Sequence, residues 1–251
     1  AIGDVFGKYN LLLAHKVLED VHAYVDHYAE IRRRGLAPFL IMDNSLWELG
    51  HALSPADLVF AAAAVGARCV VLPDKLSDGV ESARMSLEAA KEIELPSTMT
   101  WMAVIQGKTV EEFLHCYDQL STVPSIGYLS VPRIIVRENA EKSRWPYLEA
   151  LYKLRGVGKN QVHLLGFSED LHDDMRCTAH PTVMGIDSAM PVWNPAILPE
   201  RLFDSYATHG KRPTDFWDWD DKVGHIVSRA TNNIHHVRQW MLAAATVVGD
   251  K

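Results

Sequence analysis

The chain has 251 residues, of which 48% are hydrophobic and 23% are charged. This composition excludes a disordered chain, and the length suits a single large hydrophobic core, so we expect one domain over residues 1–251. The formal charge of −7 excludes a generally basic protein. Any contact with a polyanion must therefore come from a local basic surface.

Seven short β-rich runs, each ending in polar residues, are the candidate parallel strands. They are Tyr9–His15, Pro38–Asp43, Cys69–Asp74, Thr100–Gln106, Gly127–Val131, Val162–Phe167 and Val183–Asp187. Helical spacing between them predicts helices at Val17–Arg34, Pro55–Val65, Val80–Ile93, Val110–Leu120, Ala140–Leu154 and Glu169–Arg176.

Apolar strands that alternate with amphipathic helices require a parallel sheet covered by helices. Because no phosphate-binding glycine fingerprint favours an open doubly wound sheet, we expect an α/β fold of the (β/α)8 TIM-barrel type. An irregular eighth unit is expected within Leu202–Trp219, and a long closing helix within Asp221–Val248.

The cysteines, Cys69, Cys116 and Cys177, are odd in number and far apart in the sequence. This spacing favours reduced thiols in a cytoplasmic protein over a disulfide framework. The longest uncharged apolar runs, such as 58–67, are too short to span a bilayer, so we expect no membrane segment.

In a (β/α)8 barrel the polar residues that end the strands converge on one pocket. Three aspartates stand at such ends, namely Asp43, Asp74 and Asp187. One strand-end Asp taken alone is more often a helix cap or a turn residue. Three gathered carboxylates repel one another, a cost that acid, base or nucleophile roles explain. Their convergence predicts a catalytic pocket.

Five motifs, MDNSLWELG, LPDK, VIQG, HLLGF and GIDSAMP, occur in the order and spacing of the tRNA-guanine transglycosylase superfamily. From Asn10 to Pro191 the chain resembles this superfamily, and most of all its compact phage-type members, which insert 7-deazaguanine bases into DNA. If a phage encodes the chain, the resemblance implies action in the cytoplasm of an infected bacterium.

The resemblance implies a role for each matching residue. Asp187 in GIDS matches the family nucleophile, and Asp43 in MDNS matches the acid that moves protons and contacts the base. Asp74 and Gln106 match groups that read the guanine edge. The other residues expected to bind substrate are His15, Asn44, Gly107, Ser130, Val131 and Gly166, of which Ser130 and Val131 stand where the family usually has a glycine-containing loop.

The chemistry also follows from the residue types. Breaking an N-glycosidic bond develops positive charge at C1′ of the sugar, which a carboxylate such as Asp187 can capture covalently. A second carboxylate, Asp43, can protonate the departing guanine and deprotonate the incoming base. The two displacements exchange the base with retention of configuration and need no cofactor.

Two family features are absent and bear on the substrate. The chain lacks the clustered cysteines and histidine of the zinc site in transfer-RNA members, so we expect no metal, and the usual Thr-Arg pair is replaced after the nucleophile motif. Both absences favour DNA over tRNA as the substrate. The expected phosphate contacts are Arg133, Arg137, Lys142, Arg144, Lys211 and Arg212, although a solvated helix face explains these charges equally well.

Two other readings remain open. A metal-dependent barrel hydrolase is suggested by His15, His163, His172, Cys177, His180 and Asp187, but such enzymes usually place two alternate histidines on the first strand. The chain could also bind nucleic acid or modified bases without turnover, as one subunit of a heterodimer. The sequence leaves homodimer formation open.

Overall fold

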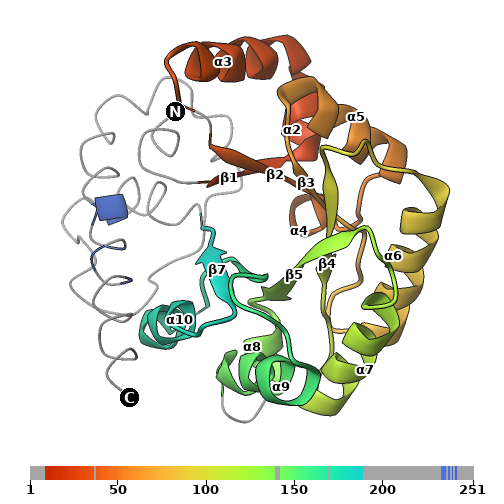
Figure 1. Ribbon diagram of the computed structural model, residues 1–251, viewed down its shortest axis with the longest axis vertical. Helices are drawn as coiled ribbons and strands as arrows, with labels where there is room; N and C mark the ends of the chain where they lie inside the picture. The colour runs from red at the N-terminus through yellow and green to blue at the C-terminus, as the bar shows by residue number, and fades with distance from the viewer. Residues whose placement is uncertain are drawn as a thin grey trace.

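The computed structural model describes residues 9–36, 38–138, 142–168, 170–188, 233–235, 237, 239 and 241. Within them, strands and helices alternate along the chain (Figure 1). The strands are β1 Tyr9–Leu13, β2 Phe39–Asp43, β3 Cys69–Val71, β4 Thr100–Val104, β5 Ile126–Pro132, β6 Val162–Leu165 and β7 Val183–Ile186.

All seven strands form one parallel sheet in the order β1-β2-β3-β4-β5-β6-β7, so each strand pairs with its neighbour along the chain. The sheet curls far enough to bring its first and last strands into contact, since the hydroxyl of Tyr9 in β1 donates a hydrogen bond of 2.6 Å to the carbonyl of Ile186 in β7. The predicted helix-covered parallel sheet is therefore confirmed.

The helices surround the curled sheet (Figure 1). They are α2 Ala14–Glu19, α3 Val21–Arg33, α4 Leu46–Leu49, α5 Pro55–Val65, α6 Gly79–Glu92, α7 Val110–Leu120, α8 Ile135–Glu138, α9 Trp145–Arg155 and α10 Leu171–Thr178. The main core lies between these helices and the sheet. A smaller cluster fills the concave face, and its buried members are Ile41, Cys69, Val71, Met102 and Val104.

Local capping explains where helices begin and end. Helix α5 has Ser54 as its N-cap, proline at the first position and Gly66 in the left-handed conformation at its end, so its predicted bounds are confirmed. The predicted helix Val17–Arg34 is instead two helices. Asp20 separates them, because its side chain accepts a hydrogen bond of 3.1 Å from the backbone N–H of Ala23 and caps α3.

Five of the strands end earlier than predicted, whereas β2 ends at Asp43 as predicted and β5 ends one residue later than predicted. Strand β1 ends at Leu13, so His15 lies in α2 and not at a strand end. Asp74, Gln106 and Asp187 likewise lie in the connections that follow β3, β4 and β7. The side chains of Asp74 and Gln106 bond to each other there, and the backbone N–H of Asp187 still donates to the carbonyl of Leu164 at 3.2 Å. The short helices α4 and α8 were not predicted, and α9 begins at Trp145 instead of Ala140.

Several predicted features lie outside the described residues. These are the eighth unit, the two basic residues Lys211 and Arg212, and most of the closing helix. Residues 233–235, 237, 239 and 241 are helical, and Val237 is buried in the main core. None of the helices in the described part of the chain combines the length and apolar character that a membrane crossing needs. All three cysteines are buried and free.

Candidate active site at the carboxyl edge of the sheet

The two carboxylates predicted to do the chemistry lie at the same edge of the sheet. Asp43 is the last residue of β2, and Asp187 directly follows β7. Because the strands are parallel, both follow the carboxyl ends, where α/β enzymes place their chemistry. The charge of Asp187 is close enough to raise the pKa of Asp43. The structure therefore brings the two carboxylates to one site.

The surroundings of Asp43 favour the protonated, uncharged form of its carboxyl group. Its pKa is raised to about 8, mainly by burial and also by the charges of Glu48, Asp187 and Asp74, against a hydrogen bond of 2.8 Å from the backbone N–H of Ser45. His15 supports this turn, with its Nδ1 2.9 Å from the Ser45 hydroxyl. At pH 7 Asp43 is thus mainly protonated and can act as an acid.

Asp187 has a different environment. Its Oδ1 lies 2.9 Å from Nε2 of His163 and accepts a hydrogen bond of 3.3 Å from the backbone N–H of Gly166. Its side chain is 22% exposed, whereas that of His163 is fully buried. Oδ1 is thus held by two contacts, and the exposure leaves the side chain open to a ligand. Asp187 remains the predicted nucleophile.

A buried polar triad joins the ends of β2, β3 and β4. Asp74 accepts hydrogen bonds of 2.7 Å from the amide of Asn44 and 2.8 Å from the amide of Gln106. All three residues are buried, with Asn44 3% exposed, Asp74 4% exposed and Gln106 1% exposed. Burial raises the pKa of Asp74 to about 6, and the two amides oppose this rise. The residues predicted to bind the base thus lie together, but their side chains are hydrogen-bonded to one another.

The remaining predicted substrate residues line the same edge at different depths. Ser130 and Val131 are fully buried, and the Ser130 hydroxyl donates to the carbonyl of Ala103 at 3.2 Å. Gly107 is buried beside Gln106. Gly166 has a φ of +69°, which places its N–H toward Asp187 and its carbonyl toward Arg144.

The predicted phosphate contacts after β5 differ in their exposure to solvent. Arg144 is fully buried and forms an ion pair with Asp174, so the structure corrects its assignment as a surface contact. Lys142 and Arg137 are exposed, and the Lys142 ammonium donates to the Arg137 carbonyl at 2.8 Å. The guanidinium of Arg133 stacks 4.2 Å above the ring of Trp47, which is 44% exposed.

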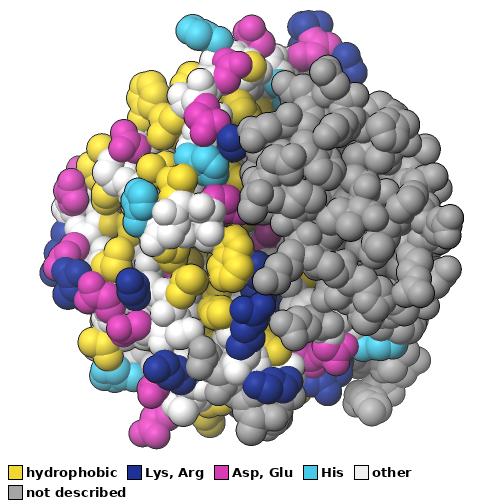
Figure 2. Space-filling view, turned by 180° about the vertical axis from the view of Figure 1, so that it is seen from behind, with side chains coloured by type: hydrophobic (Ala, Val, Ile, Leu, Met, Phe, Trp, Pro, Cys, Tyr) yellow, Lys and Arg dark blue, Asp and Glu magenta, His cyan; other side chains and the backbone are white. Residues whose placement is uncertain are grey.

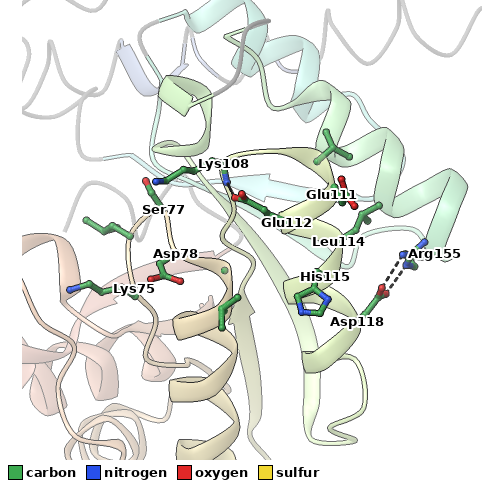
Figure 3. Close-up of a pocket in the computed structure, with 14 residues that line it drawn as sticks. Lys75, Ser77, Asp78, Lys108, Glu111, Glu112, Leu114, His115, Asp118 and Arg155 are labelled. Atoms are coloured by element: carbon green, nitrogen blue, oxygen red, sulfur yellow. Dashed lines mark hydrogen bonds and ion pairs between the residues drawn. The ribbon is translucent and has the colours of Figure 1, made fainter.

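A hollow lies beside the site, between α6 and α7 (Figure 3). Lys75 and Lys108 extend to one side of it, and the ion pair of Asp118 and Arg155 lies at the other side. The hollow adjoins the triad, because the backbone N–H of Ser77 donates to Gln106 at 3.1 Å. On the face in Figure 2, the described Lys and Arg side chains stand among acidic and hydrophobic ones.

The residues of the metal-hydrolase reading do not converge in the described structure. His163 contacts Asp187, whereas Cys177 lies near Asp173 and His180 bonds to Thr182. Among the described residues, no three His, Cys, Asp or Glu side chains are close enough to hold a metal ion.

No model of a known protein family matches the chain, and no curated protein sequence matches it significantly. The resemblance to the transglycosylase superfamily is therefore carried by the five motifs alone.

The sequence does not predict the roles of two residues of the site. It suggests His163 only as a metal ligand, and it gives no indication that Glu48 lies near Asp43. The alternation along β6 could have indicated His163, because Val162 and Leu164 are in the outer core and the residue between them must face inward. The position of Glu48 depends on the short helix α4, which its sequence did not reveal.

Proposed function

We propose that this protein is a nucleic-acid guanine transglycosylase that exchanges guanine for a 7-deazaguanine through a covalent Asp187 intermediate. DNA is the proposed substrate and tRNA the alternative. The observation that carries the proposal is that Asp43, whose pKa burial raises to about 8, and the partly exposed Asp187 lie at one edge of the sheet. We further propose that the seven strands belong to a closed (β/α)8 barrel in the cytoplasm.

Each half-reaction uses both carboxyl groups. Asp187 attacks C1′ of the flipped nucleotide, the bond from C1′ to the base nitrogen breaks, and its electron pair leaves with the guanine. Asp43 donates the proton that neutralises this leaving base. The incoming 7-deazaguanine gives a proton back to Asp43 and attacks C1′, and Asp187 departs as a carboxylate. The pKa of about 8 suits Asp43 to donate and accept in turn.

The buried triad supports recognition of the base. A carboxylate can accept about four hydrogen bonds, so Asp74 retains acceptor capacity for the N1 and N2 donors of guanine beside its two amide partners. Asp74 and Gln106 are almost inaccessible to solvent. Base binding in this proposal therefore requires these side chains to become exposed, which predicts slower association than for an open pocket.

Base exchange tests the proposal directly. DNA and tRNA are incubated separately with radiolabelled guanine, and incorporation is measured for wild type, Asp187→Asn and Asp43→Asn. We expect label in DNA with wild type and a loss of roughly 100-fold or more with either variant. Exposed Asp26→Asn, on α3, is the matched control and should retain full exchange.

A denaturing gel of wild type with DNA adds a second readout, since the covalent intermediate shifts the protein band. Label in neither polymer, without a shifted band, contradicts the enzyme and favours a binding protein. Chelator-sensitive hydrolysis would favour the metal-dependent reading, and label in tRNA alone would change the substrate.

A further inference from the structure

The group most closely tied to Asp187 is a buried imidazole. We propose that His163 is a positioning residue that holds Oδ1 of Asp187, so that Oδ2 is the atom that attacks C1′. This inference rests on the proposed function and adds to it a division of labour between the two carboxylate oxygens.

The two oxygens of Asp187 differ in their surroundings. Oδ1 lies 2.9 Å from Nε2 of His163 and 3.3 Å from the backbone nitrogen of Gly166. Among the described residues, no hydrogen bond to Oδ2 is found, although the side chain is 22% exposed. Oδ1 is thus fixed by two contacts from β6 and its following turn, and Oδ2 is left to meet a ligand.

The proton on His163 can be placed by elimination. An ionised carboxylate has only lone pairs, so the imidazole must donate through Nε2. Nδ1 is buried and has no polar partner in the described part of the chain. Hydrogen on Nδ1 would be a buried N–H without an acceptor among the described residues, which is unfavourable. The neutral tautomer with hydrogen on Nε2 satisfies both constraints.

The ring is also prevented from turning. The Tyr9 ring meets it edge-on, with centroids 5.1 Å apart and planes at 86°. Tyr9 is itself held by its hydrogen bond of 2.6 Å to the carbonyl of Ile186. This packing needs glycine at position 185, since a Cβ there would overlap the Tyr9 ring. Strands β1, β6 and β7 therefore fix the imidazole together.

The contact serves both displacements. Before attack, the donor at Oδ1 orients the carboxylate and leaves the Oδ2 lone pair for C1′. When the C1′–Oδ2 bond forms and the glycosidic bond breaks, Oδ1 becomes an ester carbonyl that still accepts from His163. When the second base attacks, C1′–Oδ2 breaks and the electron pair returns to Asp187, whose charge the same N–H stabilises. No proton leaves His163 in either step.

Substitution of His163 should change kcat without changing KM, which substitution of a merely structural residue would not do. His163→Phe removes the donor but keeps a flat ring, and His163→Gln keeps an N–H of similar reach. We expect His163→Phe to lower kcat for exchange by roughly 10- to 100-fold with KM within about twofold, and His163→Gln to recover most of the loss. The acid limb of the pH profile should change in His163→Phe, since Oδ1 of Asp187 then lacks its contact with Nε2.

The other titratable or charged groups near this carboxylate must be considered in that profile. They are Asp43 from β2 and Tyr9 from β1, with Arg133 and Arg144 packed against the neighbouring Gly166. Asp43 controls the alkaline limb in our proposal, so only the acid limb should respond to His163.

His180→Gln is the matched control, because His180 is equally buried but bonds to Thr182 away from the site. It should lower the unfolding midpoint without moving the pH profile. A ring-nitrogen NMR spectrum of wild type adds an independent readout, in which the His163 signals should show hydrogen on Nε2 and should shift in Asp187→Asn.

The outcomes separate the two proposals. Wild-type exchange with unchanged kcat and pH profile in His163→Phe overturns the positioning role alone. A His163→Gln variant no better than His163→Phe, or hydrogen found on Nδ1, also overturns it. Absence of exchange by wild type overturns the proposed function and the role of His163 with it.

Discussion

The raised pKa of Asp43 makes a quantitative prediction about stability. Its pKa rises from an ordinary value of 3.8 to about 8 on folding. Between these values the folded state holds a proton that the unfolded state has lost, so stability falls by up to about 1.4 kcal/mol per pH unit. The contribution is complete below pH 3.8 and is lost as the pH rises through 8.

Asp43→Asn removes this dependence while keeping an oxygen for the N–H of Ser45. From pH 5 to pH 8 the free energy of unfolding of the variant should rise relative to that of wild type by at most about 4 kcal/mol. Water near the half-buried carboxyl reduces the expected rise to about 2 kcal/mol. Urea unfolding at pH 5, 6, 7 and 8 measures the difference between the variant and wild type. Exposed Asp26→Asn should show a difference within about 0.5 kcal/mol throughout.

A difference that stays constant with pH would refute the reasoning, because it would mean that Asp43 titrates alike in both states. A difference that grows toward low pH would mean that Asp43 is stabilised as the anion. In either case its assignment as the acid of the reaction would fail.

Three further predictions concern the fold around the site. Arg144→Ala should cost about 3–5 kcal/mol in urea unfolding, because it leaves Asp174 buried without its partner, and Asp174→Asn in the same background should recover part of this loss. Gly185→Ala should lower the melting temperature through overlap with Tyr9, and the double variant with Tyr9→Leu should be more stable than Gly185→Ala alone. A thiol reagent at pH 8 should label wild type only after urea is added, because all three cysteines are buried.

The sequence by itself determined the alternation of strands and helices and the edge of the sheet at which Asp43, Asp74 and Asp187 lie. Apolar runs bounded by turn residues predicted all seven described strands, and the caps of α5 predicted its bounds. These features depend on residues near one another in the chain, so local spacing is enough to reveal them. The ends of β1, β3, β4, β6 and β7 were placed too late, because the runs that predicted them continue past the last paired residue.

Only the tertiary structure decided which polar residues became partners. Arg144 reads as a surface cation, yet packing against α10 buries it with Asp174, 30 residues away. Asp74 reads as an open ligand group, yet the pairing of β3 with β2 and β4 brings two amides to it. His163 is joined to Asp187 because β6 and β7 are neighbours in the sheet. Strand spacing tells which way a side chain faces, but the partner it meets depends on how separate elements pack.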